Sequence, residues 1–144
     1  MKVSAKAEYA CLAVLDLAMR HNQSETVQTS ELAKRNGIPE RFLVQILLQL
    51  KGAGLVQSVR GAAGGYRLSV APEKISLFDL IRLVDGPNAL GEADTDADRG
   101  LGRQILHAIW REVTQHEADH LRQISFQNLA DSAAELQGEN MYYI

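Results

Sequence analysis

Two sets of side chains in this sequence have the types and spacing that chemistry requires, and the first is a pair of histidines. His116 and His120 enclose Glu117 in the pattern H-E-x-x-H, which on a helix places two imidazoles on one face with a carboxylate as a potential base, as in zinc proteases. On the predicted helix, however, the histidines lie beside Ile109 and Val113, in an apolar stripe that is expected to face a partner subunit. That position leaves no open cleft for a substrate. We therefore expect interface histidines and no metal site. A metal shared across a dimer and a protease site remain the alternatives.

The second set has the hydrogen-bond donors that recognition of nucleic acid requires. Arg41 can pair bidentately with guanine, and Gln45 can pair in the same way with adenine. Arg60 stands directly before a glycine turn that can approach a DNA backbone closely, so it can enter a minor groove or hold a phosphate. The further candidates for DNA contact are Gln49, Ser58, Gly61, Gly64, Gly65, Lys2 and Lys6.

Apolar periodicity and turn residues predict the elements that must position these side chains. We expect Ser4 to cap the first helix and Thr29 or Ser30 to cap the second, and Pro39 to stand at the entrance of the third. The predicted helices cover about residues 4–20, 30–36, 40–51, 76–84, 101–124 and 126–136, and the predicted strands cover 55–59 and 66–70. Two short helices joined by a tight glycine turn form a helix-turn-helix, and the two strands form a β-hairpin wing.

The third predicted helix separates into two faces. On a helical wheel Leu43, Ile46, Leu47 and Leu50 cluster on one side, which we assign to the core. The opposite side carries Arg41, Gln45, Leu48 and Gln49, and this is the face that a recognition helix turns into a major groove.

The long predicted helix near the C-terminus carries an apolar stripe whose simplest use is burial between two copies of the chain. The expected dimer interface consists of Leu106, Ile109, Trp110, Val113, His116, His120, Leu121 and Ile124. The fold class is therefore mainly α: a winged helix-turn-helix of three helices and a hairpin, with a long C-terminal dimerisation helix. We assign residues 1–85 to a DNA-binding domain, 86–100 to a flexible acidic connection, and 101–144 to the dimerisation helix and a short last helix.

Charge is distributed unevenly along the 144 residues, whose net charge is −3. Residues 1–85 hold eleven Lys and Arg against eight Asp and Glu, whereas residues 86–144 hold four against ten. The first part is therefore the better candidate for contact with phosphate. Cys11 is the single cysteine, so no disulfide forms within one chain, and no apolar run is long enough to span a membrane. We expect a cytoplasmic protein.

Four stretches of the chain resemble the Rrf2 family of bacterial winged-helix regulators. They are SAKAEYACLAVLDLA, NGIPERFLVQIL, LKGAGLVQSVRGAAGGYRLSVAPEKISL and HAIWREV, and the third is the most specific. The resemblance implies a homodimer that recognises an approximately two-fold operator on double-stranded DNA. It also implies base contacts from the positions of Arg41, Val44 and Arg60. Because Val44 and Leu48 are apolar, base contacts there would be restricted to thymine methyls.

The sequence departs from the cluster-binding members of that family. Those members hold iron with three cysteines between the fourth helix and the long helix, and here that stretch, GPNALGEADTDADRGLG, contains none. His107 and Glu8 match single ligands of some members, but such ligands do not replace thiolates. We expect no cofactor and no iron-sulfur cluster, with Cys11 as a small buried hydrophobe and the effector unknown.

These features favour a sequence-specific transcription regulator, a repressor or an activator, over two other classes. A protein-interaction module that regulates a partner enzyme, with DNA binding lost or secondary, is the first alternative, because winged helices also serve that role. An enzyme comes last, because only the H-E-x-x-H pattern supports it.

Overall fold

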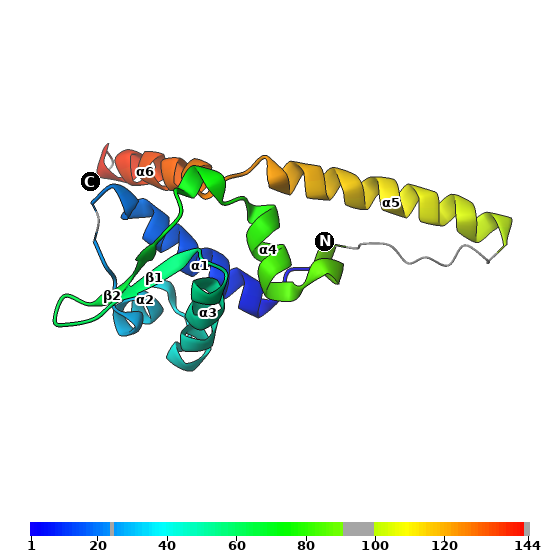
Figure 1. Cartoon of the computed structure of the whole chain (residues 1–144). Coiled ribbons are helices and arrows are strands. Elements are labelled where there is room, and N and C mark those ends of the chain that lie inside the picture. Colours follow the sequence, from blue (N-terminus) through cyan, green and yellow to red (C-terminus); the bar gives the residue numbers. More distant parts are fainter. Residues whose placement is uncertain (24, 91–99, 143–144) are drawn as a thin grey trace.

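The computed structural model describes residues 1–23, 25–90 and 100–142. These residues form six α-helices, three short 3-10 helices and one two-stranded sheet, joined by turns and loops (Figure 1). The elements in chain order are α1 Ala5–Met19, η1 His21–Gln23, α2 Thr29–Asn36, α3 Glu40–Gly52, β1 Val56–Val59, β2 Gly65–Leu68, η2 Pro72–Lys74, α4 Leu77–Asp85, η3 Pro87–Leu90, α5 Leu101–Arg122 and α6 Phe126–Tyr142.

Helix α1 is the central element of the N-terminal part and packs against α2, α3, α4 and α6. Its N-cap is Ser4, as predicted, because the hydroxyl oxygen accepts a hydrogen bond of 3.0 Å from the Ala7 amide. Ala7, Ala10 and Ala13 are all fully buried. Their small side chains allow the neighbouring helices to approach α1 closely.

Helices α2 and α3 form the predicted helix-turn-helix, joined at Gly37 in the left-handed conformation with φ of 65°. The prediction for the start of α2 was wrong. The helix begins at Thr29, and its N-cap is Gln28, whose side chain makes no capping hydrogen bond. Helix α3 begins at Glu40 as expected and ends at Gly52, one residue later than predicted.

The hairpin pairs β1 with β2 in an antiparallel register that sets Val56 opposite Leu68 and Val59 opposite Gly65. The hairpin is anchored to the segment that precedes α2. Val27 and Tyr66 exchange backbone hydrogen bonds of 2.9 and 2.8 Å, so β2 is paired on both sides at this point. The wing is therefore held in a fixed position beside the start of α2.

The core of the N-terminal part is completed by the last helix of the chain. Phe126, at the start of α6, is fully buried in the same cluster as Val14 and Leu80. Two backbone bonds of 2.9 Å, from the Phe126 amide to the Ile75 carbonyl and from the Leu77 amide to the Ile124 carbonyl, fix the chain there. Residues 1–85 alone therefore do not contain the whole core.

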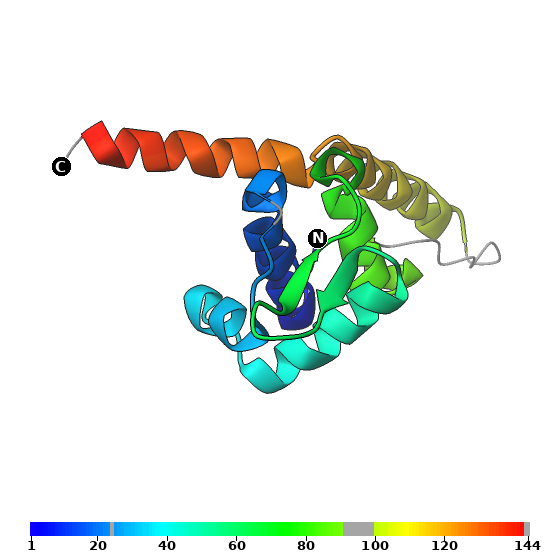
Figure 2. The same ribbon diagram turned by 60° about the vertical axis from the view of Figure 1, so that its left-hand side comes forward.

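Helix α6 is also longer than predicted, because it continues to Tyr142 rather than ending near Leu136. It passes through Gly138, which costs an exposed helix about 1 kcal/mol relative to alanine but does not end it. Helices α5 and α6 leave the N-terminal part in opposite directions (Figure 2). The prediction of a short last helix was wrong.

The region predicted as a flexible connection begins as regular structure. Pro87–Leu90 forms η3, and Leu90 is buried in a second apolar cluster with Phe78 of α4 and Leu121 of α5. This cluster attaches the C-terminal part of α5 to α4. The remainder of the predicted connection, residues 91–99, lies outside the described residues.

Candidate nucleic-acid interface

Helix α3 presents the two faces that its sequence predicts. Leu43, Ile46, Leu47 and Leu50 are buried, at most 1% exposed. Arg41, Gln45 and two apolar residues are exposed on the other face. The apolar pair is Val44 at 45% exposure and Leu48 at 56%. The exposed face thus combines a guanidinium, an amide and two aliphatic side chains.

Gln49 does not share this exposed position. Its side chain is half-buried, and its Nε2 donates a hydrogen bond of 3.0 Å to the carbonyl oxygen of Leu83 on α4. The amide therefore anchors α3 to α4 at the flank of the exposed face. Sequence periodicity places Gln49 near that face but does not show this contact.

The wing presents Arg60 at its turn, where the side chain is exposed. The turn is closed by a hydrogen bond of 2.9 Å from the Gly64 amide to the Gly61 carbonyl. A Cβ at Gly65 would lie 2.4 Å from the carbonyl oxygen of Val27, and Gly65 has a φ of 150°. Glycine is required at Gly65 by the close approach of the protein's own backbone.

Two further contacts connect the wing with the helix-turn-helix. Lys51 at the end of α3 donates a hydrogen bond of 2.9 Å from Nζ to the hydroxyl of Ser58 in β1. The hydroxyl of Thr26 donates a hydrogen bond of 2.6 Å to the carbonyl oxygen of Ala63 in the turn. The predicted Ser58 is thus exposed but already bonded, and Lys51, which the sequence analysis did not select, lies beside it.

The first turn of α2 is a feature that the sequence analysis missed. Because Gln28 provides no side-chain cap, the first amides of α2 have no side-chain acceptor at this end of the helix. Amides in this position bind phosphate readily. A groove separates the start of α2 from the wing, and its lining includes Arg67 and Gln28 together with the carboxylates of Glu25 and Glu31.

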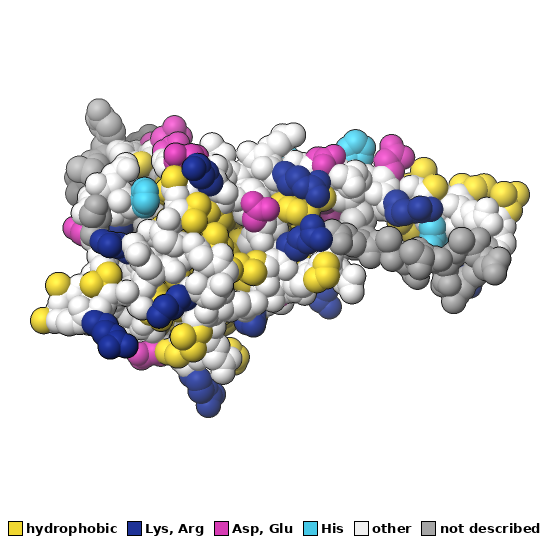
Figure 3. All heavy atoms as spheres, in the orientation of Figure 1, with side chains coloured by type: hydrophobic (Ala, Val, Ile, Leu, Met, Phe, Trp, Pro, Cys, Tyr) yellow, Lys and Arg dark blue, Asp and Glu magenta, His cyan; other side chains and the backbone are white. Residues whose placement is uncertain are grey.

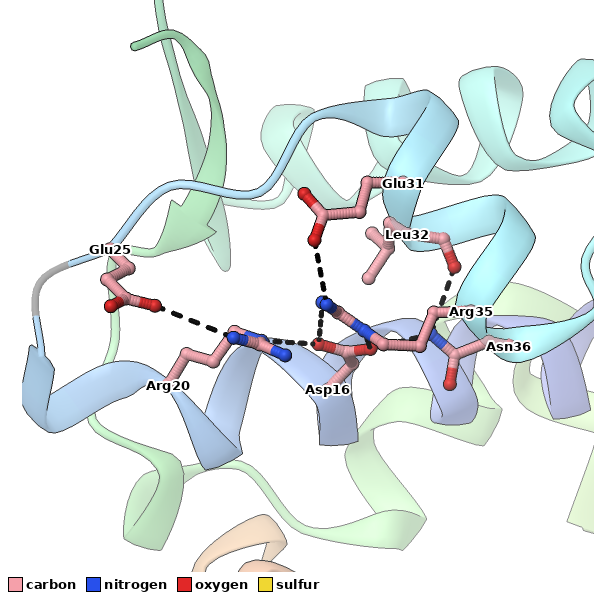
Figure 4. A network of polar contacts seen from close by, with 7 residues as sticks. All are labelled: Asp16, Arg20, Glu25, Glu31, Leu32, Arg35 and Asn36. Atoms are coloured by element: carbon pink, nitrogen blue, oxygen red, sulfur yellow. Dashed lines mark hydrogen bonds and ion pairs between the residues drawn. The ribbon is translucent and has the colours of Figure 1, made fainter.

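A charged network anchors α2 to α1 (Figure 4). Asp16 of α1 is 7% exposed and accepts hydrogen bonds from Arg20, Arg35 and Asn36 at 2.7 to 3.1 Å. Burial by itself raises the pKa of Asp16, but the hydrogen bonds from Arg35, Asn36 and Arg20 outweigh it, so the pKa lies below its usual value. The ionised carboxylate fixes the orientation of α2.

Lys2 and Lys6 are exposed near the start of α1. The N-terminal ammonium pairs with Glu117 of α5 at 3.2 Å, and the Ser4 hydroxyl donates to Asp85 of α4. Figure 1 accordingly shows the N-terminus beside α4. Both lysines are exposed, and their contact with DNA stays a prediction.

Among the described helices, exposed large hydrophobic side chains are most numerous on α5. Figure 3 shows Lys and Arg side chains around the wing and the helix-turn-helix and also on α5, and hydrophobic side chains at the far end of α5 and also at the wing. The exposed hydrophobic residues of α5 are Leu101, Ile105, Leu106, Ile109, Trp110 and Val113, with exposed fractions of 47 to 75%. Leu101 and Ile105 were not among the predicted interface residues.

Two members of the predicted dimer interface instead face the same chain. Leu121 is 7% exposed and packs with Phe78 and Ile81 of α4. Ile124 is half-buried, and its carbonyl oxygen accepts a hydrogen bond from the Leu77 amide. Leu121 therefore has little surface left for a second copy, and its place in the dimer interface stays a prediction.

The histidines of the H-E-x-x-H pattern are exposed on α5. His116 lies 3.9 Å from Glu112, and Glu117 is occupied by the N-terminal ammonium. Within the described residues no group of three or more His, Cys, Asp or Glu side chains is arranged to hold a metal ion. No helix of the described residues has the length and apolar character for crossing a membrane.

An exposed helix face that carries Arg41 and Gln45 beside an anchored β-hairpin defines the class: a winged helix-turn-helix protein of the DNA-binding type. The model of the Rrf2 family, described as iron-dependent transcriptional regulators, matches residues 3–132. The chain belongs to the Rrf2 family of transcriptional regulators.

Individual relatives agree with this assignment. The chain is 35% identical over 130 residues to the HTH-type transcriptional regulator IscR of Vibrio campbellii, a match that covers 90% of this chain and 77% of the relative. Among solved structures, T. potens IscR superposes with a TM-score of 0.78 at 32% identity, covering 95% of this chain and 91% of that one. CymR, the global cysteine regulator of B. subtilis, superposes with a TM-score of 0.80 at 29% identity. The superposition covers 92% of this chain and 98% of CymR.

The family description raises the question of iron, and the donor set of this chain does not fit an iron-sulfur cluster. Such clusters are held mainly by cysteine thiolates, and Cys11 is the single cysteine. Its side chain lies half-buried on α1 between the two apolar clusters. Burial, followed by the negative charges of Asp85 and Glu8, raises the pKa of Cys11 to about 11, which disfavours the thiolate that a metal would require.

Proposed function

We propose that the chain binds duplex DNA as a homodimer and recognises a two-fold operator in the cytoplasm, as a repressor or an activator, without an iron-sulfur cluster. The observation that carries this proposal is the exposed face of α3, where Arg41 and Gln45 are both exposed beside a wing that presents Arg60. Both elements are fixed to the same core, so the two sets of donors keep a constant relation to each other.

In this proposal α3 enters the major groove. Arg41 and Gln45 lie one helical turn apart and reach base edges, while Arg60 enters the neighbouring minor groove or holds its phosphates. The uncapped first turn of α2 and the side chains of Lys2 and Lys6 contact phosphates. Such contacts fix the position of the protein on the duplex without reading sequence.

The second copy of the chain is inferred from α5. Its exposed stripe of Ile105, Leu106, Ile109 and Val113 has no cover from the described residues of the same chain. A second α5 is the simplest partner, because an isologous contact buries both stripes at once. His116 and His120 lie on the same side of α5 as Ile109 and Val113 by helical spacing, and so would border this contact.

Binding to a duplex selected from a random pool tests the proposal, with fluorescence anisotropy as the readout. We expect affinity to fall steeply as salt rises, because phosphate contacts release counterions. Replacing Arg60 with alanine (Arg60→Ala) should weaken specific binding at least about tenfold while the protein remains dimeric. Arg111→Ala is the matched control, because Arg111 is exposed on α5, away from its apolar stripe. Equal affinities of the Arg60→Ala variant and the unaltered protein would refute the wing assignment.

A further inference from the structure

The exposed face of α3 contains an apolar patch, defined here as Val44 and Leu48. Their exposed fractions of 45 and 56% contrast with full burial of Leu43 and Leu47 on the same helix. By helical geometry the patch lies between Arg41 and Gln45 on one side and Lys51 on the other. Aliphatic side chains surrounded by cationic and amide donors do not contribute to the protein's own core.

The chemistry of base edges limits what such a patch can contact in a major groove. Guanine, adenine and cytosine are distinguished there by their donors and acceptors, whereas thymine also presents a methyl group, on C5. An aliphatic side chain against a donor or acceptor would remove its water without replacing the hydrogen bond, which is unfavourable. Against a thymine methyl, both surfaces lose unfavourable contact with water.

We infer that Val44 and Leu48 are specificity-determining residues that select thymine in each half of the operator through its C5 methyl group. This inference rests on the proposed DNA binding and adds to it the base that the apolar patch prefers. Arg41, in the first turn of α3, then selects guanine, and the two aliphatic side chains select thymines farther along the groove.

The spacing of the patch predicts where these thymines lie. Val44 and Leu48 are four residues apart, which corresponds to about 6 Å along a helix axis. Successive bases on one strand are about 3.4 Å apart along the duplex. The two methyl groups are therefore expected roughly two base steps apart within one half-site.

Replacement of thymine by deoxyuridine tests the inference, because it removes the methyl group and leaves base pairing unchanged. Operators selected from a random duplex pool are resynthesised with deoxyuridine at one thymine at a time, and affinity is measured by anisotropy. We expect about a fourfold loss at each contacted thymine, the effect of one buried carbon, and no loss at thymines outside the half-sites. Cytosine methylated at C5, placed at the same position, should bind better than unmethylated cytosine.

Protein variants then assign each methyl group to a side chain. Val44→Ser should abolish the difference between thymine and deoxyuridine at one position, and Leu48→Gln should abolish it at the other. Leu136→Gln on α6 is the matched control, because Leu136 is 60% exposed and lies outside the proposed interface. Since all three residues are exposed, the variants should fold like the unaltered protein.

The outcomes separate this inference from the function on which it rests. Tight, salt-sensitive binding with equal affinity for thymine and deoxyuridine at every operator position would overturn the inference and leave DNA binding intact. A difference that persists unchanged in both Val44→Ser and Leu48→Gln would also overturn it. Failure to bind any duplex would overturn both proposals.

Discussion

Arg35 on α2 and Asp16 on α1 form a bidentate ion pair, with Nε to Oδ2 and Nη2 to Oδ1 both at 2.7 Å. Asn36 donates to the same carboxylate at 2.8 Å, so two consecutive residues at the end of α2 are held by one side chain (Figure 4). Bidentate geometry restricts rotation as well as distance. The orientation of the first helix of the helix-turn-helix therefore depends on a single buried acid.

Asp16→Asn should lower the free energy of unfolding by about 2 kcal/mol, because an amide cannot accept from both guanidinium nitrogens and leaves part of the network unsatisfied. Urea unfolding followed by circular dichroism measures this, at one protein concentration because the proposed dimerisation would also contribute. Asp131→Asn on α6 is the control, since Asp131 is exposed and accepts a single hydrogen bond within the described part of the chain, from Gln127. Equal losses in the two variants would contradict a special role for Asp16.

The same carboxylate makes stability depend on pH in a defined direction. The pKa of Asp16 is lower in the folded than in the unfolded protein, where it is about 3.9. The stabilisation by the ionised Asp16 carboxylate is therefore present above about pH 4. It is lost as the pH falls through the lower pKa that Asp16 has in the folded protein. Unfolding curves recorded from pH 6 to pH 2 should show a smaller decline for Asp16→Asn than for the unaltered protein. Parallel declines would contradict this reading.

Sequence periodicity predicted the parts of the fold that local spacing determines. The buried and exposed faces of α3 follow from the 3.6-residue repeat, and the wing follows from alternation around a glycine turn. Two other features depend on contacts between distant segments. Nothing local distinguishes Phe126 as part of the N-terminal core, or Gln49 as a partner of the Leu83 carbonyl.

The apolar stripe of α5 illustrates the same limit. Its residues are all apolar, and the sequence therefore groups Leu121 with Ile109. The structure divides them, because the end of α5 packs on α4 while the preceding turns extend away from the N-terminal part (Figure 1). Periodicity identifies an apolar surface but does not show whether the same chain or a second one covers it.

Gly65→Ala should displace the wing, because the new Cβ would lie 2.4 Å from the backbone oxygen of Val27 and the residue has a φ of 150°. Gly61→Ala is the comparison: its φ of 108° is also unfavourable, but nothing lies within 4 Å of the added carbon. We expect a loss of stability of about 2 kcal/mol or more for Gly65→Ala, and a smaller loss for Gly61→Ala. A thermal unfolding series measures both. Greater damage from Gly61→Ala would contradict the importance of the Val27 contact.

Ile109→Glu should separate the proposed dimer, because a carboxylate in the middle of the exposed α5 stripe would be buried there without a partner. Analytical ultracentrifugation should show a dimer for the unaltered protein and a monomer for this variant. Leu136→Glu on α6 controls for added negative charge, since Leu136 is exposed to a similar degree. A dimeric Ile109→Glu protein would place the interface elsewhere.

Cys11 should react slowly with alkylating reagents, because burial and the charges of Asp85 and Glu8 raise its pKa to about 11. At pH 8 the thiolate is then about a thousandth of the total, and the rate of alkylation by iodoacetamide should rise about tenfold per pH unit until the pH approaches 11. The unfolded protein in urea, where the pKa of the thiol is near 8.5, provides the fast reference.

The raised pKa of Cys11 in the folded protein also makes stability depend on pH. This contribution to stability is fully present below about pH 8.5 and is lost as the pH rises toward 11. Cys11→Ala should lack this alkaline decline, and rapid alkylation of the folded protein at pH 8 would show that the thiolate forms more readily than its surroundings indicate.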